Sequence, residues 1–326
     1  MLVKLKNLLR WFPLRASISL AGLIISLLLL LFSVMARLDP HLLLLLLLVH
    51  FLLGGVHTTT IIGLAARLPI IYPGAVLLGA AVSGVLAALL TSVQLEVGLV
   101  ERITLIYGLI FLLAVYLAAF DIHFALPLNT FYQRHIDRKP VINSKISLLV
   151  PSHLHLFLSS LITHLILPSI LHSISPLATS WKSNLHFSSL LGFANFHLAA
   201  ATGVFAAIFS LLPSCWLLLL LTIVRLLLLP LLLFANIFPD TRRLPVLLTW
   251  DWTLILTITL SGLLAGYLTT ATFAASLSNV DATMVVVDKQ MQSRRAMRSY
   301  LVLLAGTLVG ACLALGIPAL LQIEVR

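Results

Sequence analysis

Long apolar blocks alternate with short polar segments along the whole chain. A bilayer core about 30 Å thick needs roughly 20 apolar residues per helix, so each block of that length predicts one membrane-spanning helix. The fifth block is the least regular, because Pro151 and Pro168 interrupt helical hydrogen bonding within it. Nine blocks qualify, over residues 15–36, 41–65, 70–93, 102–124, 146–170, 187–212, 214–235, 252–277 and 297–321.

The composition excludes a water-soluble fold. Of the 326 residues, 61% are hydrophobic and only 9% are charged, whereas soluble domains carry about 25% charged residues. The basic residues ahead of the first block are also found in secretory signals, but that block is too long for a signal peptide and predicts a retained helix. We therefore expect an all-α integral membrane protein with lipid around most of its surface.

The net charge of +10 indicates membrane topology and not a nucleic-acid partner, because Lys and Arg occur in short clusters between apolar blocks. Loops rich in Lys and Arg stay in the cytoplasm, which favours a cytoplasmic N-terminus and an outer C-terminus. The inner loops then hold Lys4, Lys6, Arg10, Arg15, Arg67, Arg134, Arg138, Lys139, Lys145, Lys289, Arg294, Arg295 and Arg298. The outer segments hold only Arg37, Arg102, Lys182, Arg242, Arg243 and Arg326.

The polar segment over residues 125–145 divides the chain into two predicted helical bundles. Residues 1–145 would form an N-terminal bundle of four helices with the inner loop, and residues 146–326 a C-terminal bundle of five. Gly262 and Gly266, like Gly306 and Gly310, place small residues one turn apart, which favours close helix packing.

Metal or cofactor chemistry has little support in the sequence. Cys215 and Cys312 lie in or beside apolar segments, without the partners that a disulfide framework or a metal site requires. His153 and His155 on the fifth predicted helix point to different sides of it, and the chain has no His-Glu-x-x-His motif. We expect no metal, no cofactor and no enzymatic activity.

The seventh and eighth predicted helices carry a recognisable pattern over residues 223–280. Its residues are Arg225, Pro230, Asn236, Pro245, Val246, Asp251, Gly266, Tyr267, Leu268 and Val280. This pattern resembles the equilibrative nucleoside transporter family, in which an arginine opens a proline-containing helix that ends in an asparagine before a Leu-Pro-Val loop.

Two earlier segments resemble the same family. Residues 63–69 look like the junction after its fourth helix, and Leu126-Pro127 with Phe131-Tyr132 looks like the end of its sixth. The predicted helices then correspond to the family's helices three to eleven, an incomplete major-facilitator-like arrangement of two bundles that lacks the first two helices. Loss of two helices keeps the N-terminus on the same side, so the family's cytoplasmic N-terminus agrees with the charge distribution.

The resemblance also implies where a nucleoside would bind. The family's helix eight carries an Asp-x-x-Gly-Arg element, and alignment on Gly203 and Pro213 places Ala200 at the aspartate and Val204 at the arginine. Shifting the alignment does not place an acidic residue at the aspartate position, because no acidic residue lies between positions 137 and 240.

Eight candidate substrate-binding residues follow from these alignments and from polarity. Thr58 aligns with a family glutamine that contacts the base and Thr59 with a neighbouring small position, although threonines in membrane helices commonly bond to their own backbone. Arg225 near mid-membrane is either a substrate or gating contact or a buried arginine satisfied by neighbouring carbonyl groups. The candidates are Thr58, Thr59, Asn195, His197, Ala200, Val204, Arg225 and Tyr267.

Two functions remain open at this point. The resemblance implies facilitative passage of a small solute, a nucleoside or nucleobase, by alternating access, and the central parts of the predicted helices hold no acidic group that could carry a coupling ion. The alternative is a truncated or divergent, non-transporting relative with a structural or regulatory role in the membrane. It is favoured by the absence of the family's helix-eight aspartate and arginine and of its first two helices.

Overall fold

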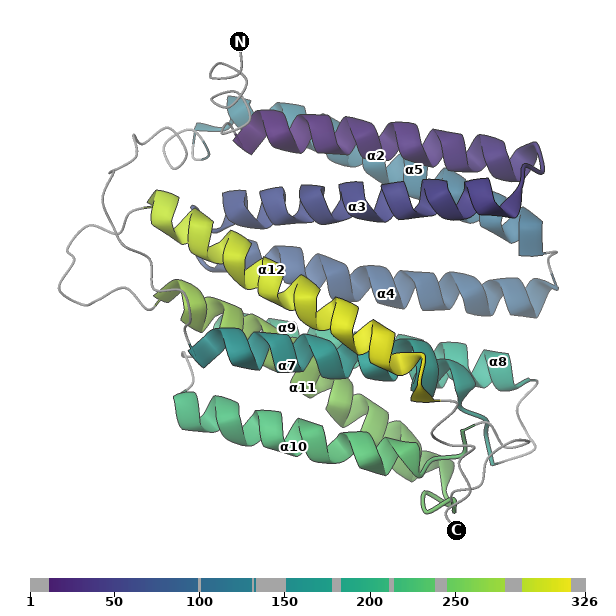
Figure 1. Ribbon diagram of the computed structural model, residues 1–326. Coiled ribbons are helices and arrows are strands. Elements are labelled where there is room, and N and C mark those ends of the chain that lie inside the picture. Colours follow the sequence, from purple (N-terminus) through teal and green to yellow (C-terminus); the bar gives the residue numbers. More distant parts are fainter. Residues whose placement is uncertain are drawn as a thin grey trace. The chain divides into compact units, whose positions relative to one another are not determined.

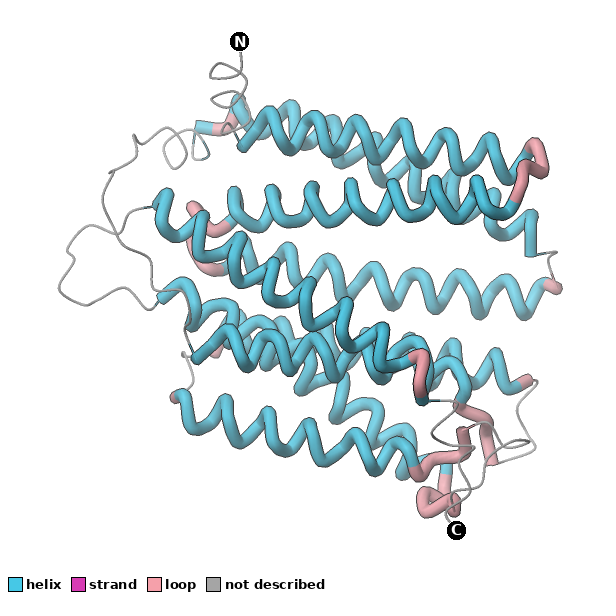
Figure 2. Tube along the Cα trace, in the orientation of Figure 1, coloured by secondary structure: helices cyan, strands magenta, loops and turns pink. Residues whose placement is uncertain are grey.

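The chain is a multi-pass helical membrane protein. The computed structural model describes residues 12–98, 101–130, 132, 151–177, 183–210, 214–237, 245–278 and 289–317. Within these ranges the regular segments are helices and no strand is present, as Figure 2 shows by colour. Eight of the helices are long and apolar enough to cross a bilayer, which confirms the predicted all-α integral membrane class.

The fifth predicted helix is helical but irregular. It consists of α7 (Pro151–Leu165), a π-helical segment η2 (Ile166–Ile170) and a short 3-10 segment η3 (Leu171–Ser173). The α-helical part is only 15 residues long, so it is not among the eight spans. The π-helical turn contains position 168, where proline has no N–H to donate to an α-helical bond.

By their contacts the helices divide into two compact units, and Figure 1 labels the helices of both. The first contains α2 (Phe12–Met35), α3 (Pro40–Ala65), α5 (Glu101–Ala125), the short η1 (Leu126–Leu128) and the first turns of α12 (Lys289–Ala314). The second contains α4, α7, η2, η3, α8, η4, α9, α10, α11 and the rest of α12. Its remaining bounds are α4 (Ile71–Val97), α8 (Asn184–Phe187), η4 (Ser188–Ala194), α9 (Asn195–Phe209), α10 (Cys215–Leu233) and α11 (Asp251–Ser278). By its contacts α4 thus belongs with the later helices, and the division into bundles at residue 145 stays a prediction.

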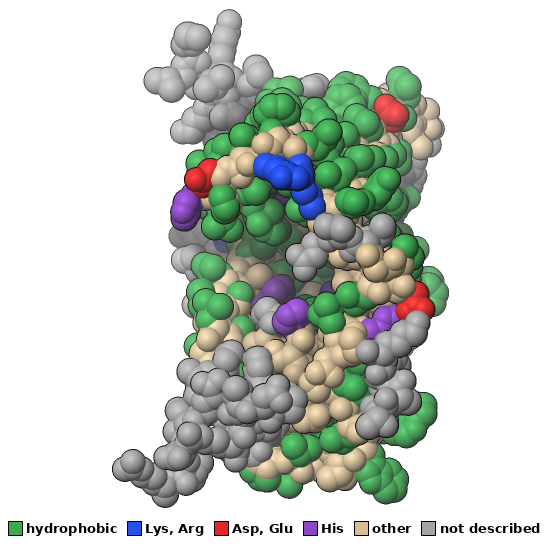
Figure 3. Space-filling model, turned by 90° about the vertical axis from the view of Figure 1, so that its right-hand side faces the viewer, with side chains coloured by type: hydrophobic (Ala, Val, Ile, Leu, Met, Phe, Trp, Pro, Cys, Tyr) green, Lys and Arg blue, Asp and Glu red, His purple; other side chains and the backbone are tan. Residues whose placement is uncertain are grey.

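The outer surfaces of the helices are apolar, as contact with lipid requires. Long side chains such as Phe51, Leu52, Leu227 and Leu256 are well exposed on α3, α10 and α11. Figure 3 looks along the helices at one of their ends, where few charged side chains lie among the many hydrophobic ones drawn in colour.

In the first unit, α2 and α3 pair through matched serine and histidine side chains. The Ser26 hydroxyl lies 2.9 Å from Nδ1 of His50, and the Ser19 hydroxyl lies 3.0 Å from Nδ1 of His57. The two serines and the two histidines are each about two helical turns apart. Because α3 runs back along α2, this equal spacing fixes the register of the helix pair.

Replacing Ser26 with alanine is expected to destabilise the protein by about 1–2 kcal/mol, because the buried Nδ1 of His50 loses its partner. Ser83→Ala is the control, since that hydroxyl is exposed on α4 and bonds to the carbonyl of Ala80; its effect should stay within about 0.5 kcal/mol. Thermal unfolding of the purified variants measures both changes in stability. An unfolding midpoint for Ser26→Ala equal to that of Ser83→Ala would contradict this account of helix pairing.

In the second unit, α9 and α11 approach so closely that their backbones touch. A Cβ atom built at Gly266 would overlap the carbonyl oxygen of Ala200, and one at Gly203 would overlap that of Leu263. A Cβ at Gly262 would likewise overlap the carbonyl oxygen of Phe196. Glycine is therefore required at these crossing points, as expected for small residues at membrane helix contacts.

The second small-residue pair has the same role. A Cβ at Gly306 would overlap the carbonyl oxygen of Phe157, and one at Gly310 that of Leu161, so α12 packs closely on α7. Both glycine pairs predicted from the sequence to be packing surfaces are confirmed.

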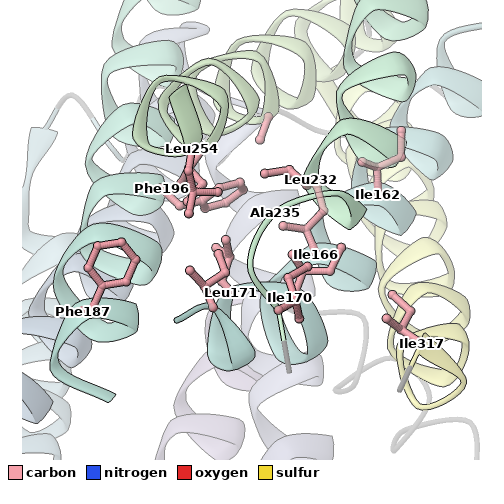
Figure 4. Packing of buried hydrophobic residues seen from close by; sticks show 14 residues of the cluster. Ile162, Ile166, Ile170, Leu171, Phe187, Phe196, Leu232, Ala235, Leu254 and Ile317 are labelled. Carbon is pink, nitrogen blue, oxygen red and sulfur yellow. The ribbon is translucent and has the colours of Figure 1, made fainter. Parts of the chain in front are cut away.

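A cluster of buried apolar side chains joins the helices of the second unit. Ile166 comes from η2 and Leu171 from η3, while Phe196 comes from α9, Leu232 from α10 and Leu254 from α11. Figure 4 shows these side chains converging between their helices. The core therefore lies directly beside the segment η2–η3 and the start of α9.

Two residues of the family-like pattern hold connecting segments in place. Asn236 accepts a backbone hydrogen bond from Ser175 at 2.8 Å, and its side-chain amide donates to the Ser175 carbonyl at 3.1 Å. Asp251, at the start of α11, accepts from the backbone N–H of Leu177 at 3.0 Å. These bonds fix the chain that follows η3, and with it the position of η3.

Candidate functional site

The second unit contains a cavity of about 280 Å³ bordered by α4, η3, α8, η4 and α9. Its polar groups are hydroxyls and imidazoles, and Asp, Glu, Lys and Arg are absent from its described lining. Such a lining recognises hydrogen-bonding groups and not a full charge. The lining residues are Gly84, Ala87, Ala88, Thr91, His172, Leu185, Ser188, Ser189, Phe193 and His197.

His197 is the one sequence candidate that lines this cavity. It is half-buried on α9, and its imidazole lies against Gly84 on α4, where a Cβ atom would overlap the ring. The preceding residue, Phe196, is buried in the core, and the two rings meet edge to face with centroids 5.6 Å apart. Thus two consecutive residues of α9 have different environments: Phe196 lies in the core and His197 lines the cavity.

The π-helical segment η4 supplies two of the hydroxyl groups of the cavity, those of Ser188 and Ser189, and α4 supplies that of Thr91. Ser189 donates a hydrogen bond to the carbonyl of Ala88 on α4 at 2.8 Å and accepts one from Ser92 at 3.0 Å. These bonds attach η4 to α4. A π-helix is rare and occurs often at functional sites, because its wider turn redirects side chains.

Asn195 and Tyr267 lie outside the described cavity lining. The Asn195 amide bonds to the Thr259 hydroxyl on α11 in both directions, at 3.0 and 3.1 Å. Tyr267 is half-buried against an apolar cluster from α9, α10 and α11 that includes Leu218 and Leu268. Asn195 therefore joins α9 to α11, and Tyr267 packs among apolar side chains.

Ala200 and Val204 are both buried where α9 packs closely against its neighbours. Ala200 contacts Ala81 of α4, while its carbonyl faces Gly266 of α11. The backbone N–H of Val204 lies beside the same glycine. Apolar side chains thus occupy both of these buried positions beside the close contact with Gly266.

Arg225 is fully buried in α10 and is held by α7. One guanidinium nitrogen donates to the carbonyl and the hydroxyl oxygen of Ser159, both at 2.7 Å, and another donates to the Thr163 hydroxyl. A buried arginine with neighbouring acceptors was one of the two interpretations of this residue. Its bonds join α10 to α7, whose own hydroxyl at Ser159 also lies 3.1 Å from that of Thr269 on α11.

Thr58 and Thr59 belong to the first unit. Their hydroxyls donate to the carbonyls of Gly54 and Gly55, one turn earlier in α3, at 2.9 and 2.6 Å. This is the local bonding that is common for threonine in membrane helices. Within the described residues, no three His, Cys, Asp or Glu side chains are grouped so as to hold a metal ion.

Sequence reasoning missed most of the cavity. Thr91, His172, Ser188 and Ser189 come from separate parts of the chain, and the block over 187–212 gave no sign of a π-helical turn. The available signal was the cluster of small residues Ser188, Ser189 and Gly192 at its start. Gly192 packs on Leu171 and so places η4 beside η3.

These features define a polytopic membrane protein with an uncharged polar cavity among its helices. Comparison with known families identifies the chain more closely. A family model described as Nucleoside transporter matches residues 141–317, more than half of the chain. The chain belongs to the nucleoside transporter family, which confirms the resemblance seen over residues 223–280. No curated protein matched the chain.

Proposed function

We propose that this protein moves nucleosides or nucleobases across the membrane passively, by alternating access, and that the cavity beside His197 binds the solute. The observation that carries this proposal is the uncharged polar lining of a cavity inside the region that matches the family model. A nucleoside is neutral and rich in hydrogen-bonding groups, so it suits such a lining. In this proposal the N-terminus is cytoplasmic and the C-terminus lies outside.

The lining offers the groups that a nucleoside needs. Imidazole nitrogens of His172 and His197 can donate to or accept from the edge of a base. The hydroxyls of Thr91 and Ser188 donate to backbone carbonyls one turn away and can still accept hydrogen bonds from a ribose. Phe193 provides an aromatic face for a base. A phosphorylated nucleotide would find no Lys or Arg in the described lining, so we expect it to be excluded.

The remaining sequence candidates support this site from a distance. We assign Asn195 and Arg225 to positioning, because each bonds to side chains of a neighbouring helix. Ala200 and Val204 allow α9 to approach its neighbours, and Tyr267 packs against the same helices. Thr58 and Thr59 remain candidates for contacts made in other states of an alternating-access cycle.

Uptake by purified protein in liposomes tests the proposal. Labelled adenosine and uridine should enter down their gradients at equal pH on both sides, and unlabelled nucleoside should compete while nucleoside monophosphate should not. Uptake that needs a pH gradient would contradict the passive mechanism. No uptake by folded, reconstituted protein would favour a non-transporting relative.

A further inference from the structure

A second cavity, of about 330 Å³, lies in the first unit where α2 ends and α3 and α5 begin. It is lined by Ser33, Val34, Arg37, Leu43, Arg102 and Leu105. Two guanidinium groups thus share a small space with apolar side chains, of which Leu105 is exposed, Leu43 half-buried and Val34 buried. Because these helices span the bilayer, their ends lie near the level of the lipid headgroups.

The two arginines have different local roles. Arg102 donates to the carbonyls of Val34 and Met35 at the end of α2, at 3.2 and 2.6 Å, so it caps that helix. Arg37 is exposed, and its guanidinium has no hydrogen bond or ion pair with any residue that the structure describes. Helix capping therefore explains Arg102 and leaves Arg37 without an intramolecular role.

The backbone at Arg37 is strained. Its φ angle is 56°, the left-handed conformation, and it follows the end of α2 where Leu38 N–H bonds back to the Ser33 carbonyl. Glycine is the usual residue at this position of a helix end, because the Cβ atom of any other residue is crowded there. An arginine at this position costs stability, which favours a function for its side chain.

The surroundings favour a negative charge beside these arginines. Leu43 lies in the first turns of α3, and Arg102 and Leu105 in those of α5, so the positive ends of two helix dipoles border the cavity. The negative end of α2 borders it as well, but two of its carbonyls already accept hydrogen bonds from Arg102. The nearby carboxylate of Asp39 already accepts the backbone N–H of His41 at 2.7 Å. Figure 3 shows the Lys and Arg side chains of one face gathered in a single patch beside apolar ones.

We propose that Arg37 and Arg102 bind the phosphate group of a membrane phospholipid, whose acyl chains lie on the neighbouring leucines. Guanidinium groups bind phosphate through paired, charge-assisted hydrogen bonds. Exposed Leu105 and half-buried Leu43 extend the cavity toward the apolar surface, as an amphipathic ligand requires. A basic pocket between membrane helices is a known form of headgroup site.

Native mass spectrometry of delipidated protein with added phosphatidylglycerol tests this proposal. Arg37→Gly should weaken phosphatidylglycerol binding about tenfold, the loss of one charge-assisted contact. It should also leave the thermal unfolding midpoint equal or higher, because glycine adopts a φ of 56° without strain. Arg15→Gln, at the opposite end of α2, is the control and should bind the lipid as the wild type does.

Two results would overturn the proposal. Equal phosphatidylglycerol binding by wild type, Arg37→Gly and Arg15→Gln would show that the cavity holds no phosphate group. Inorganic phosphate at millimolar concentration should not displace the lipid; displacement would identify the ligand as a soluble anion and not a phospholipid.

Discussion

Replacing Gly266 with alanine is expected to destabilise the protein by about 3 kcal/mol, near the upper end of the cost of overpacking a core. The added methyl group would overlap the carbonyl oxygen of Ala200 and lie 2.9 Å from the backbone nitrogen of Val204. Backbone atoms of a packed helix cannot turn aside as a side chain can. The crossing of α9 and α11 would have to open, and the cavity wall on α9 would move with it.

Gly79→Ala provides the matched control, because a Cβ atom at this position of α4 has no neighbour within 4 Å. Alanine in place of an unconstrained helical glycine should leave the stability equal or raise it by up to about 1 kcal/mol. Thermal unfolding in detergent compares the two variants. Similar midpoints for Gly266→Ala and wild type would mean that α9 and α11 do not touch as described.

His197→Ala is expected to lower the initial rate of adenosine uptake roughly tenfold or more, because the solute loses a hydrogen bond inside the cavity. Gly84→Ala should have a comparable effect, since its methyl group would displace the imidazole ring. The ring can rotate away, so the fold should survive. His41→Ala, at an exposed histidine of α3, should transport as the wild type does.

The double variant Gly84→Ala/His197→Ala tests whether Gly84→Ala lowers uptake by displacing His197. If the methyl group at position 84 acts by moving His197, then adding Gly84→Ala to His197→Ala should cause little further loss, because the two changes share one interaction. If the fold losses in uptake rate of the two single variants multiply in the double variant, the contact between Gly84 and His197 would be contradicted. Gly79→Ala again controls for the change of glycine to alanine within α4.

The apolar pattern was sufficient to predict the fold class and most of the spanning helices, because burial in lipid leaves few alternatives to a helix of bilayer length. The spacing of the glycines in α11 and α12 also predicted their close packing, whereas the contact at Gly203 of α9 was not foreseen. It could not predict that α4 groups with the later helices, since that depends on contacts such as Ser92 with Ser189, far apart in the chain.

The candidate site was less predictable for a physical reason. Polarity alone does not distinguish Asn195, which bonds to Thr259, from His197, which lines the cavity, although they are two residues apart. The hydrogen-bond partners of Arg225 could not be predicted either, because Ser159 and Thr163 lie on α7, far from it in the sequence. The π-helical turns at η2 and η4 change which side chains face the cavity, and an apolar run does not reveal them.

Protection of a cysteine by adenosine tests most directly whether the cavity binds the solute. Thr91→Cys would be introduced after Cys215 and Cys312 are replaced by alanine, with His41→Cys at the exposed start of α3 as the control. Our account predicts that adenosine slows labelling of the cysteine at position 91 by a small thiol reagent and leaves labelling at position 41 unaffected. Equal labelling of position 91 with and without adenosine, in protein that transports adenosine, would contradict it.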